Sequence, residues 1–174
     1  MDFDGRPEPP HRVMGIDLAA LPKNPTGLCT IGKTISLSTV YGDQEILSYV
    51  HRMAPDMVAV DAPLMEEIRV READRLLKKY GAMPPTMPSM ALLTERARRI
   101  VTRLKAPVIE VFPTASAKIL GIYEKNWRSM AEKIGIPAQK KHELDAYLAA
   151  YTAYLFTIGK AEKVGGAVVI PKVF

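Results

Sequence analysis

Short apolar runs separated by turn residues dominate the first third of the chain. The run at residues 13–20 is followed by a turn signal at residues 24–27 (NPTG). The runs at residues 28–31 and 34–41 come next, and the second of these alternates β-branched with polar residues. Such runs, bounded by Gly, Pro and Asn, are typical of strands joined by short turns. The pattern predicts three antiparallel strands.

The pattern then changes to helical spacing over residues 44–53, where Ile46, Leu47, Val50 and Met53 share one helix face. A nearly continuous apolar run over residues 57–60 predicts a strand covered on both faces, as parallel strands are. Further helices are predicted over residues 68–80, 91–105, 114–121, 126–134 and 141–159, and a further strand over residues 108–112. Residues 168–170 fit either a terminal strand or an extended tail.

A proline-rich segment, residues 83–90 (MPPTMPSM), interrupts the helical region. Its prolines exclude regular helix there, so the segment is an irregular connection, either a mobile flap or a well-packed loop. Strand-helix-strand units cross over with a right hand, which places the predicted strands side by side. The sequence therefore predicts an α/β fold with a mixed sheet.

The length of 174 residues and the hydrophobic fraction of 48% suit one domain with a substantial core. We expect residues 1–12 to form a flexible lead and residues 13–174 to form that domain. The single cysteine, Cys29, excludes an internal disulfide and reads as a small core residue. The longest apolar stretch, residues 146–158, is shorter than a membrane-spanning helix, so we expect a soluble, cytoplasmic protein without membrane contact.

The net charge of +5 and the pI of about 9.3 suit an anionic partner such as nucleic acid. Basic residues gather on two of the predicted helices. They are Arg69, Arg71, Arg75, Lys78 and Lys79 on the first, and Arg96, Arg98, Arg99, Arg103 and Lys105 on the second. On the second helix the apolar stripe is expected to face inward and the arginines outward. A solvated helix face and a phosphate-contacting surface both explain this pattern.

Four acidic residues are placed where a predicted strand ends or a helix begins. Asp17 lies in the first apolar run, Asp61 follows the strand at 57–60, Glu110 interrupts the strand at 108–112, and Asp145 lies near the start of the last helix. A carboxylate in an apolar strand is costly unless it is paired, hydrogen-bonded or bound to a cation. Gathered carboxylates favour a hard divalent cation, so the pattern predicts a Mg²⁺ or Mn²⁺ site.

Each acid also has a structural explanation. Asp17 could bond to the turn at residues 24–27, Asp61 could cap the loop before Pro63, Glu110 could pair with a helix arginine, and Asp145 could pair with Lys141. Taken singly, each acid favours the structural explanation, because ion-pair networks also place carboxylates in such positions. Taken together, the four favour a site.

Other polar residues lie close to these acids in the sequence. Lys141 and His142 precede Asp145 by about one helical turn and are candidates to contact a phosphate or to carry a proton. Arg71 and Arg75 are candidates for bidentate phosphate contacts, or for an ion pair with the acids. Thr114 and Ser116 follow the Glu110 strand and could bond to a phosphate or cap the next helix.

These motifs resemble a known family. The segments MGIDLA, NPTG, VAVDAPL, READRLLKKYG, IEVFPTAS, KHELDAYLAAYTAYLF and VIP occur in order over about residues 13 to 171. Together they resemble the uncharacterised domain family 429, described as predicted nucleases of ribonuclease H-like fold. The resemblance implies a mixed five-stranded sheet flanked by helices.

The resemblance also implies a carboxylate active site formed by Asp17, Asp61, Glu110 and Asp145. Asp17, Asp61 and Asp145 would be its metal ligands. Metal-dependent hydrolysis of nucleic acid phosphodiester bonds is the activity that it implies. Junction-cutting relatives of this fold often act as homodimers, and a homodimer is compatible with the resemblance.

Two other functions fit the same sequence. One is a non-catalytic nucleic-acid-binding module that would lose affinity when Arg96, Arg99 and Arg103 are neutralised. The other is an ATP-dependent phosphotransferase of the actin-like superfamily. Proteins of that superfamily resemble one another in a glycine-rich phosphate turn after the first aspartate, where this chain has Leu18, Ala19 and Ala20.

Overall fold

The computed structural model describes residues 11–173, which form a seven-stranded sheet in the order β3-β2-β1-β4-β5-β7-β6. The strands are β1 (Val13–Asp17), β2 (Thr26–Ile31), β3 (Ile35–Val40), β4 (Met57–Val60), β5 (Val108–Val111), β6 (Ala161–Val164) and β7 (Val168–Pro171). β1, β2 and β3 are antiparallel, whereas β1, β4, β5 and β7 run parallel. The expected lead at residues 1–12 lies mostly outside the described residues.

The order β3-β2-β1-β4-β5 with these strand directions is the ribonuclease H-like arrangement, so the predicted fold class is confirmed. The predicted number of five strands was too low. Residues 168–171 form β7 rather than a tail, and β6 pairs with it as an antiparallel hairpin at the sheet edge. The turn uses Gly165 and Gly166, both at positive φ, which suits glycine.

The helices follow the predicted order with different bounds. They are α1 (Asp43–Met53), α2 (Glu72–Leu76), the 3₁₀ helix η1 (Leu77–Tyr80), α3 (Pro88–Val101), α4 (Pro113–Ile119), α5 (Trp127–Ile134) and α6 (Lys141–Thr157). The helix predicted over residues 68–80 begins only at Glu72, so Arg69 lies in the preceding loop. α3 begins inside the proline-rich segment, because Pro88 occupies its first turn, where the missing N–H is tolerated.

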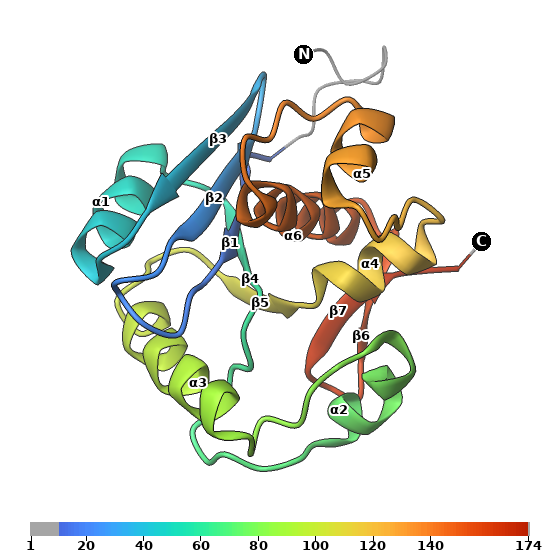
Figure 1. Ribbon diagram of the computed structural model, residues 1–174. Helices are drawn as coiled ribbons and strands as arrows, with labels where there is room; N and C mark the ends of the chain where they lie inside the picture. Colours follow the sequence, from blue (N-terminus) through green and yellow to red (C-terminus); the bar gives the residue numbers. More distant parts are fainter. Residues whose placement is uncertain (1–10, 174) are drawn as a thin grey trace.

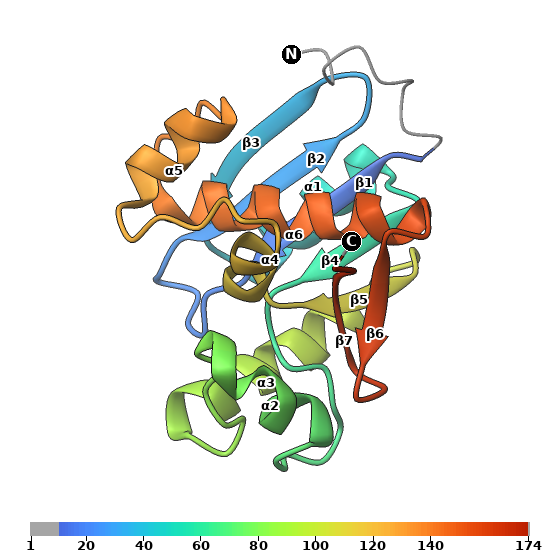
Figure 2. The same cartoon turned by 90° about the vertical axis from the view of Figure 1, so that its right-hand side faces the viewer.

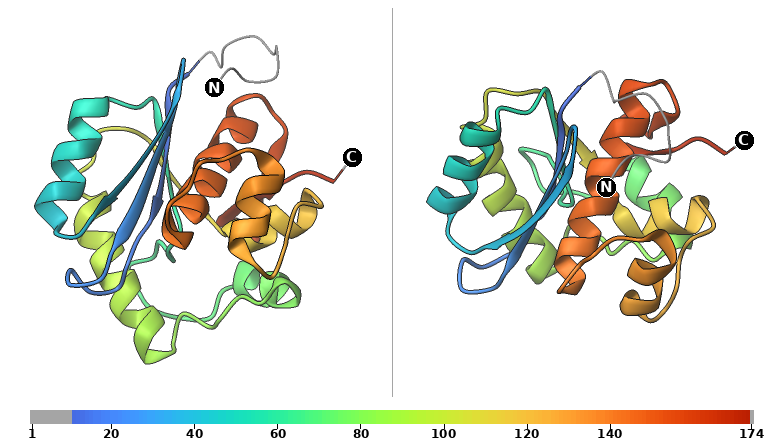
Figure 3. Two further views of the ribbon diagram at one scale, coloured as in Figure 1. Left: turned by 45° about the horizontal axis from the view of Figure 1, so that its top comes forward. Right: turned by 90° about the horizontal axis from the view of Figure 1, so that it is seen from above.

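Helices cover both faces of the sheet (Figures 1 and 3). α1 and α3 pack on one face, and α4, α5 and α6 lie on the other. The alternation of β1 serves both layers. Val13 belongs to the core under α6, and Met14 and Ile16 belong to the core under α1 and α3. Figure 2 shows α2 and the start of α3 projecting beyond the sheet edge where β1, β4 and β5 end.

α6 lies directly against β1 and β2. A Cβ added at Gly15 would overlap the carbonyl oxygen of Ala146, and one added at Gly27 would overlap that of His142. The helix surface at this contact is made of alanines that are fully buried, namely Ala146, Ala149, Ala150 and Ala153. Glycine facing alanine thus lets the helix and sheet backbones approach closely.

The prediction that the α3 arginines face outward was wrong for Arg96, which is completely buried. Its Nε donates to Asp43 Oδ1 at 2.8 Å, and its two terminal nitrogens donate to the carbonyl oxygens of Ala19 and Tyr41, each at 2.6 Å. A buried guanidinium is tolerated because its donors are satisfied. Arg96 therefore ties α3 to the loops after β1 and β3. Arg98, Arg99 and Arg103 are exposed.

No helix among residues 11–173 is long and apolar enough to cross a membrane. Cys29 is buried in β2 with a free thiol, as expected for a core residue.

Candidate active site

Two of the predicted acids meet at the ends of β1 and β4. The parallel register aligns Ile16 with Val60, so the next residues, Asp17 and Asp61, are neighbours across the sheet. The backbone N–H of Asp61 donates to the carbonyl oxygen of Ile16 at 2.9 Å, which continues the ladder to this point. Sheet pairing therefore fixes both acids at the same edge.

Each of the two carboxyl groups changes the pKa of the other. Burial raises the pKa of both, the charge of Asp61 adds to the rise at Asp17, and the charge of Asp145 adds to it at both acids. Together these effects raise the pKa of Asp61 to about 7. A hydrogen bond between the two side chains raises the pKa of Asp17 and lowers that of Asp61. Two ionised carboxylates are therefore costly at this position unless a positive charge lies beside them.

Asp145 approaches the pair from the first turns of α6. Its Oδ2 accepts a hydrogen bond from Lys141 Nζ at 2.8 Å, and the two residues are one turn apart on the helix. Burial lowers the pKa of Lys141, but the carboxylates of Asp145, Asp17 and Asp61 outweigh it and leave a net rise. In turn, Lys141 lowers the pKa of Asp17 and Asp61 in part. The lysine therefore acts as a counter-charge to all three acids.

The donor chemistry of this cluster suits a hard cation, since it consists of carboxylate oxygens. The geometry, however, is not that of a complete metal site. Among residues 11–173, no group of three or more His, Cys, Asp or Glu side chains is arranged to hold a metal ion. Asp145 is paired with Lys141, and Asp17 and Asp61 are bonded to each other. A cation would need these contacts to rearrange.

Glu110 lies on β5 next to β4, but its carboxylate points to a different partner. The Arg71 guanidinium donates two hydrogen bonds to it, of 2.7 and 2.8 Å, and the backbone N–H of Leu64 donates a third at 2.9 Å. Arg71 also bonds to both carboxylate oxygens of Asp74. This Arg71–Glu110–Asp74 network joins β5 to α2 and to the loop at residues 61–71. The sequence left two partners open for Glu110, a metal ion and an arginine, and in the structure its carboxylate is paired with Arg71.

A cavity of about 270 Å³ opens beside the Asp17–Asp61 pair. The ends of β1, β4 and β5 form its polar side, and residues of η1, the proline-rich segment and α3 form its apolar side. The apolar lining includes Leu77, Met83, Met90, Leu93 and Phe112. Sequence reasoning did not assign these residues to the site. The sequence feature that could have pointed to them is the methionine-rich composition of residues 83–90, where Met83 is half exposed (50%).

The remaining predicted site residues are dispersed. Arg75 is exposed on α2, on the outer side of the Arg71 network. Thr114 is half-buried in the first turn of α4. Ser116 is fully buried, and its hydroxyl lies 2.8 Å from that of Thr152, so it faces α6 rather than solvent. His142 Nε2 lies 3.1 Å from Thr39 Oγ1, and burial lowers the pKa of this histidine.

No family model and no curated protein matches the chain. Two solved structures of RuvC from Thermus thermophilus are similar to it, and one of them is in complex with a Holliday junction substrate. Each is 18% identical and covers 85% of this chain and 96% of its own. The TM-scores are 0.48 for the complex and 0.47 for the other structure. The fold assignment rests on the strand order and directions given above.

Proposed function

We propose that the protein is a metal-dependent phosphodiesterase that acts on nucleic acid. The observation that carries this proposal is the placement of Asp17 and Asp61 side by side at the ends of β1 and β4, with Asp145 close enough to raise the pKa of both. A structural pair of acids gains nothing from a third carboxylate beside it. A cation site gains a ligand.

In this proposal Asp17, Asp61 and Asp145 hold one or two Mg²⁺ or Mn²⁺ ions. Bound there, the ions would activate water and stabilise the leaving oxygen of a phosphodiester. The chain's own residues set the conditions for loading. Asp17 and Asp61, whose pKa values are raised by burial, must ionise, and Asp145 must leave Lys141.

Lys141, once released, is a free cation at the edge of the site. Its side chain is 65% exposed even in the ion pair, so it can turn toward a substrate phosphate without crossing the core. Glu110 has a positioning role in this proposal, because Arg71 and Leu64 occupy its carboxylate and it fixes the loop that carries Asp61. Nucleic acid is the proposed substrate class, since the site chemistry addresses phosphodiesters and the chain carries a net charge of +5.

The test begins with metal binding, which needs no knowledge of the substrate. Mn²⁺ affinity is measured by electron paramagnetic resonance at pH 8 on the wild type and on Asp17→Asn, Asp61→Asn and Asp145→Asn. Glu95→Gln, which removes an exposed carboxylate from α3, is the control. We expect each of the three site variants to bind Mn²⁺ at least ten-fold more weakly and the control to match the wild type.

The second stage tests hydrolysis. Wild-type protein with Mn²⁺ is incubated with single-stranded, duplex and branched DNA and RNA. We expect cleavage of at least one substrate and its loss in Asp17→Asn and Asp61→Asn. Full activity in either folded variant would refute the proposed site.

A non-catalytic nucleic-acid-binding module is the second candidate. The Lys141–Asp145 ion pair favours it, because a built-in ammonium can replace a metal ion as the permanent counter-charge. This candidate predicts salt-dependent binding with no Mn²⁺ affinity above that of Asp61→Asn. The Mn²⁺ titration therefore separates the two functions.

A further inference from the structure

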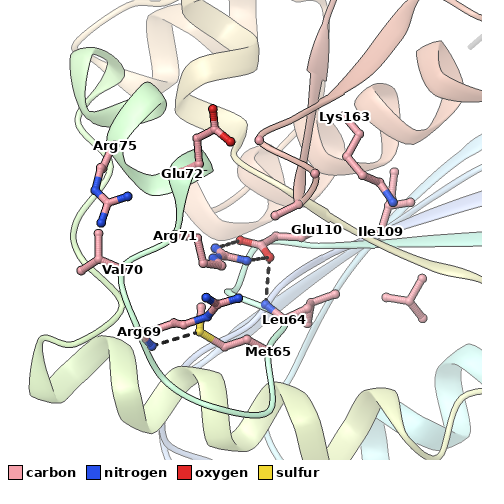
Figure 4. Close-up of a pocket in the computed structure, with 14 residues that line it drawn as sticks. Leu64, Met65, Arg69, Val70, Arg71, Glu72, Arg75, Ile109, Glu110 and Lys163 are labelled. Atoms are coloured by element: carbon pink, nitrogen blue, oxygen red, sulfur yellow. Dashed lines mark hydrogen bonds and ion pairs between the residues drawn. The ribbon is translucent and has the colours of Figure 1, made fainter.

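A second and larger cavity, of about 660 Å³, lies on the outer side of the Arg71–Glu110–Asp74 network (Figure 4). The loop that precedes α2, strand β5 and the turn of the β6–β7 hairpin form its walls. Glu110 lines both this cavity and the one beside the acid pair, so the network is the partition between them. The volume is in the range of ligand pockets, about 300–1,000 Å³.

The side chains around this outer cavity are predominantly cationic. Arg69, Arg71, Arg75 and Lys163 contribute positive charges, and Glu72 and Glu110 contribute negative ones. Arg71 and Glu110 satisfy each other through the bidentate pair. Arg69, Arg75 and Lys163 then remain against Glu72 alone. The side chains of these three residues make no hydrogen bond and no ion pair with any of residues 11–173. The dashed line at Arg69 in Figure 4 comes from its backbone N–H, which donates to Met65 Sδ.

The three cations come from separate elements, as Figure 4 shows. Arg69 lies beside the Arg71–Glu110 pair, Arg75 extends from α2, and Lys163 enters from the hairpin on the opposite side. Cations on one helix face are readily explained as a solvated surface. Unpaired cations that three elements direct around one cavity are better explained by an anionic ligand.

The walls of the cavity are fixed. The hairpin turn packs so tightly on α2 that a Cβ at Gly165 would lie 2.5 Å from the backbone nitrogen of Ala73. On the other side, the loop at residues 61–71 is held by the contacts of Leu64 and Arg71 to Glu110. Lys163 and the two arginines therefore project from anchored backbone, which reduces the entropy lost when they close on a ligand.

We propose that this outer cavity binds the phosphate backbone of a nucleic acid strand at a point remote from the bond that is cleaved. Guanidinium groups pair with phosphate oxygens through two hydrogen bonds, and an ammonium adds a point charge. The cavity is larger than a single phosphate needs, so it also accommodates the attached sugar. The inference rests on the proposed function, and it adds a strand path that crosses the Arg71–Glu110–Asp74 network.

The test compares two triple variants that lose the same charge. One carries Arg69→Gln, Arg75→Gln and Lys163→Gln. The control carries Arg52→Gln, Lys125→Gln and Arg128→Gln, which neutralises exposed residues at the end of α1 and around the start of α5. Binding of a fluorescent single-stranded oligonucleotide of about 20 nucleotides is measured against salt concentration, in EDTA so that no cleavage occurs. Each lost phosphate contact reduces the salt slope by about 0.7.

We expect the cavity variant to bind at least ten-fold more weakly and to lose about 2 from the salt slope. The control is expected to change less than three-fold. Equal losses in the two variants would overturn the proposal, because they would show a general charge effect. Calorimetry with inorganic phosphate forms the other arm. Tight phosphate binding that is lost in the cavity variant, with oligonucleotide affinity unchanged, would assign the cavity to a small anion instead.

Failure here is distinguishable from failure of the proposed function. Oligonucleotide binding in EDTA does not depend on the acid cluster, so it is expected to survive in Asp61→Asn. If the wild type cleaves a substrate but the cavity variant keeps the wild-type salt slope, the proposed nuclease activity is supported and the outer phosphate site is refuted. If the cavity variant loses oligonucleotide binding but the wild type cleaves no substrate, the outer phosphate site is supported and the proposed nuclease activity is refuted.

Discussion

Lys141 Nζ lies 2.8 Å from Asp145 Oδ2, one helical turn further along α6. The same ammonium also lowers the pKa of Asp17 and Asp61, so a single positive charge partly balances the carboxyl groups of Asp17, Asp61 and Asp145. The charge that a divalent cation would supply is thus partly supplied by the chain itself. Metal loading and the Lys141–Asp145 ion pair compete for the same carboxylate.

Lys141→Met is therefore expected to raise Mn²⁺ affinity three- to ten-fold at pH 8. The variant keeps a long side chain but removes the competing ammonium, so Asp145 becomes free to bind the cation. The pKa of Asp61 should rise above about 7, because Lys141 no longer lowers it. Electron paramagnetic resonance measures the affinity, and carbon-detected NMR of the carboxyl groups measures the titration. Lys140→Met, the exposed neighbour, is the control, and weaker Mn²⁺ binding by Lys141→Met would refute the competition.

The acid pair should make the protein less stable as the pH rises. Asp61 titrates near 7 in the folded state and near 4 when unfolded. The folded state therefore holds more protons between these values, and the free energy of unfolding falls across the window from pH 4 to 7. Asp61→Asn should remove much of this fall and gain on the order of 3 kcal/mol relative to the wild type at pH 8. Urea unfolding at pH 4.5 and pH 8 measures the difference. A gain of equal size at both pH values would contradict it.

Arg71→Met should be strongly destabilising, because it leaves the carboxylates of Glu110 and Asp74 without their shared partner. Breaking one side of a buried ion pair costs about 3–5 kcal/mol. Arg75→Met, at an exposed position on α2, should cost less than about 0.5 kcal/mol. Denaturant unfolding at neutral pH measures both.

Glu110→Gln tests the positioning role separately. It should lower stability while leaving Mn²⁺ affinity within two-fold of the wild type. A ten-fold loss of Mn²⁺ affinity in this variant would instead make Glu110 a metal ligand.

Gly15→Ala should be among the most damaging single-methyl changes in the chain. The added Cβ would overlap the carbonyl oxygen of Ala146, so α6 would have to move away from β1. We expect a loss of about 3 kcal/mol or more, at the upper end for overpacking. Gly32→Ala is the matched control, since its added Cβ would meet only the Arg12 side chain at ordinary contact distances. Comparable stability of the two variants would contradict the close approach of α6.

Much of the fold could be predicted from the sequence because its signals are local. The apolar runs of β1, β4 and β5 and the spacing of α1 and α6 depend on neighbouring residues only. The β6 strand was missed because Ala161–Val164 is short and half charged, and its place in the sheet depends on pairing with β7. The burial of Arg96 was missed because its partner Asp43 is 53 residues away in the sequence.

The candidate site was predictable to a similar extent. Asp17 ends β1 and Asp61 follows the parallel neighbour β4, and the register alone brings them together. The position of Glu110 on β5 was also readable, but its choice of Arg71 over the other acids was not. That choice depends on where the loop at residues 61–71 places a guanidinium. The domain limits and a homodimer remain predictions.

The close packing of α6 on Gly15 and Gly27 also affects which movements can bring Asp145 to a cation. Because the helix backbone lies in direct contact with two strands, we expect it to keep its place when a cation binds, so that Asp145 reaches the ion by rotation about its side-chain bonds. Rotations of this kind at partly exposed residues take picoseconds to nanoseconds. Cation capture would then be a local and rapid event, and the main-chain positions of the empty and loaded protein should superpose.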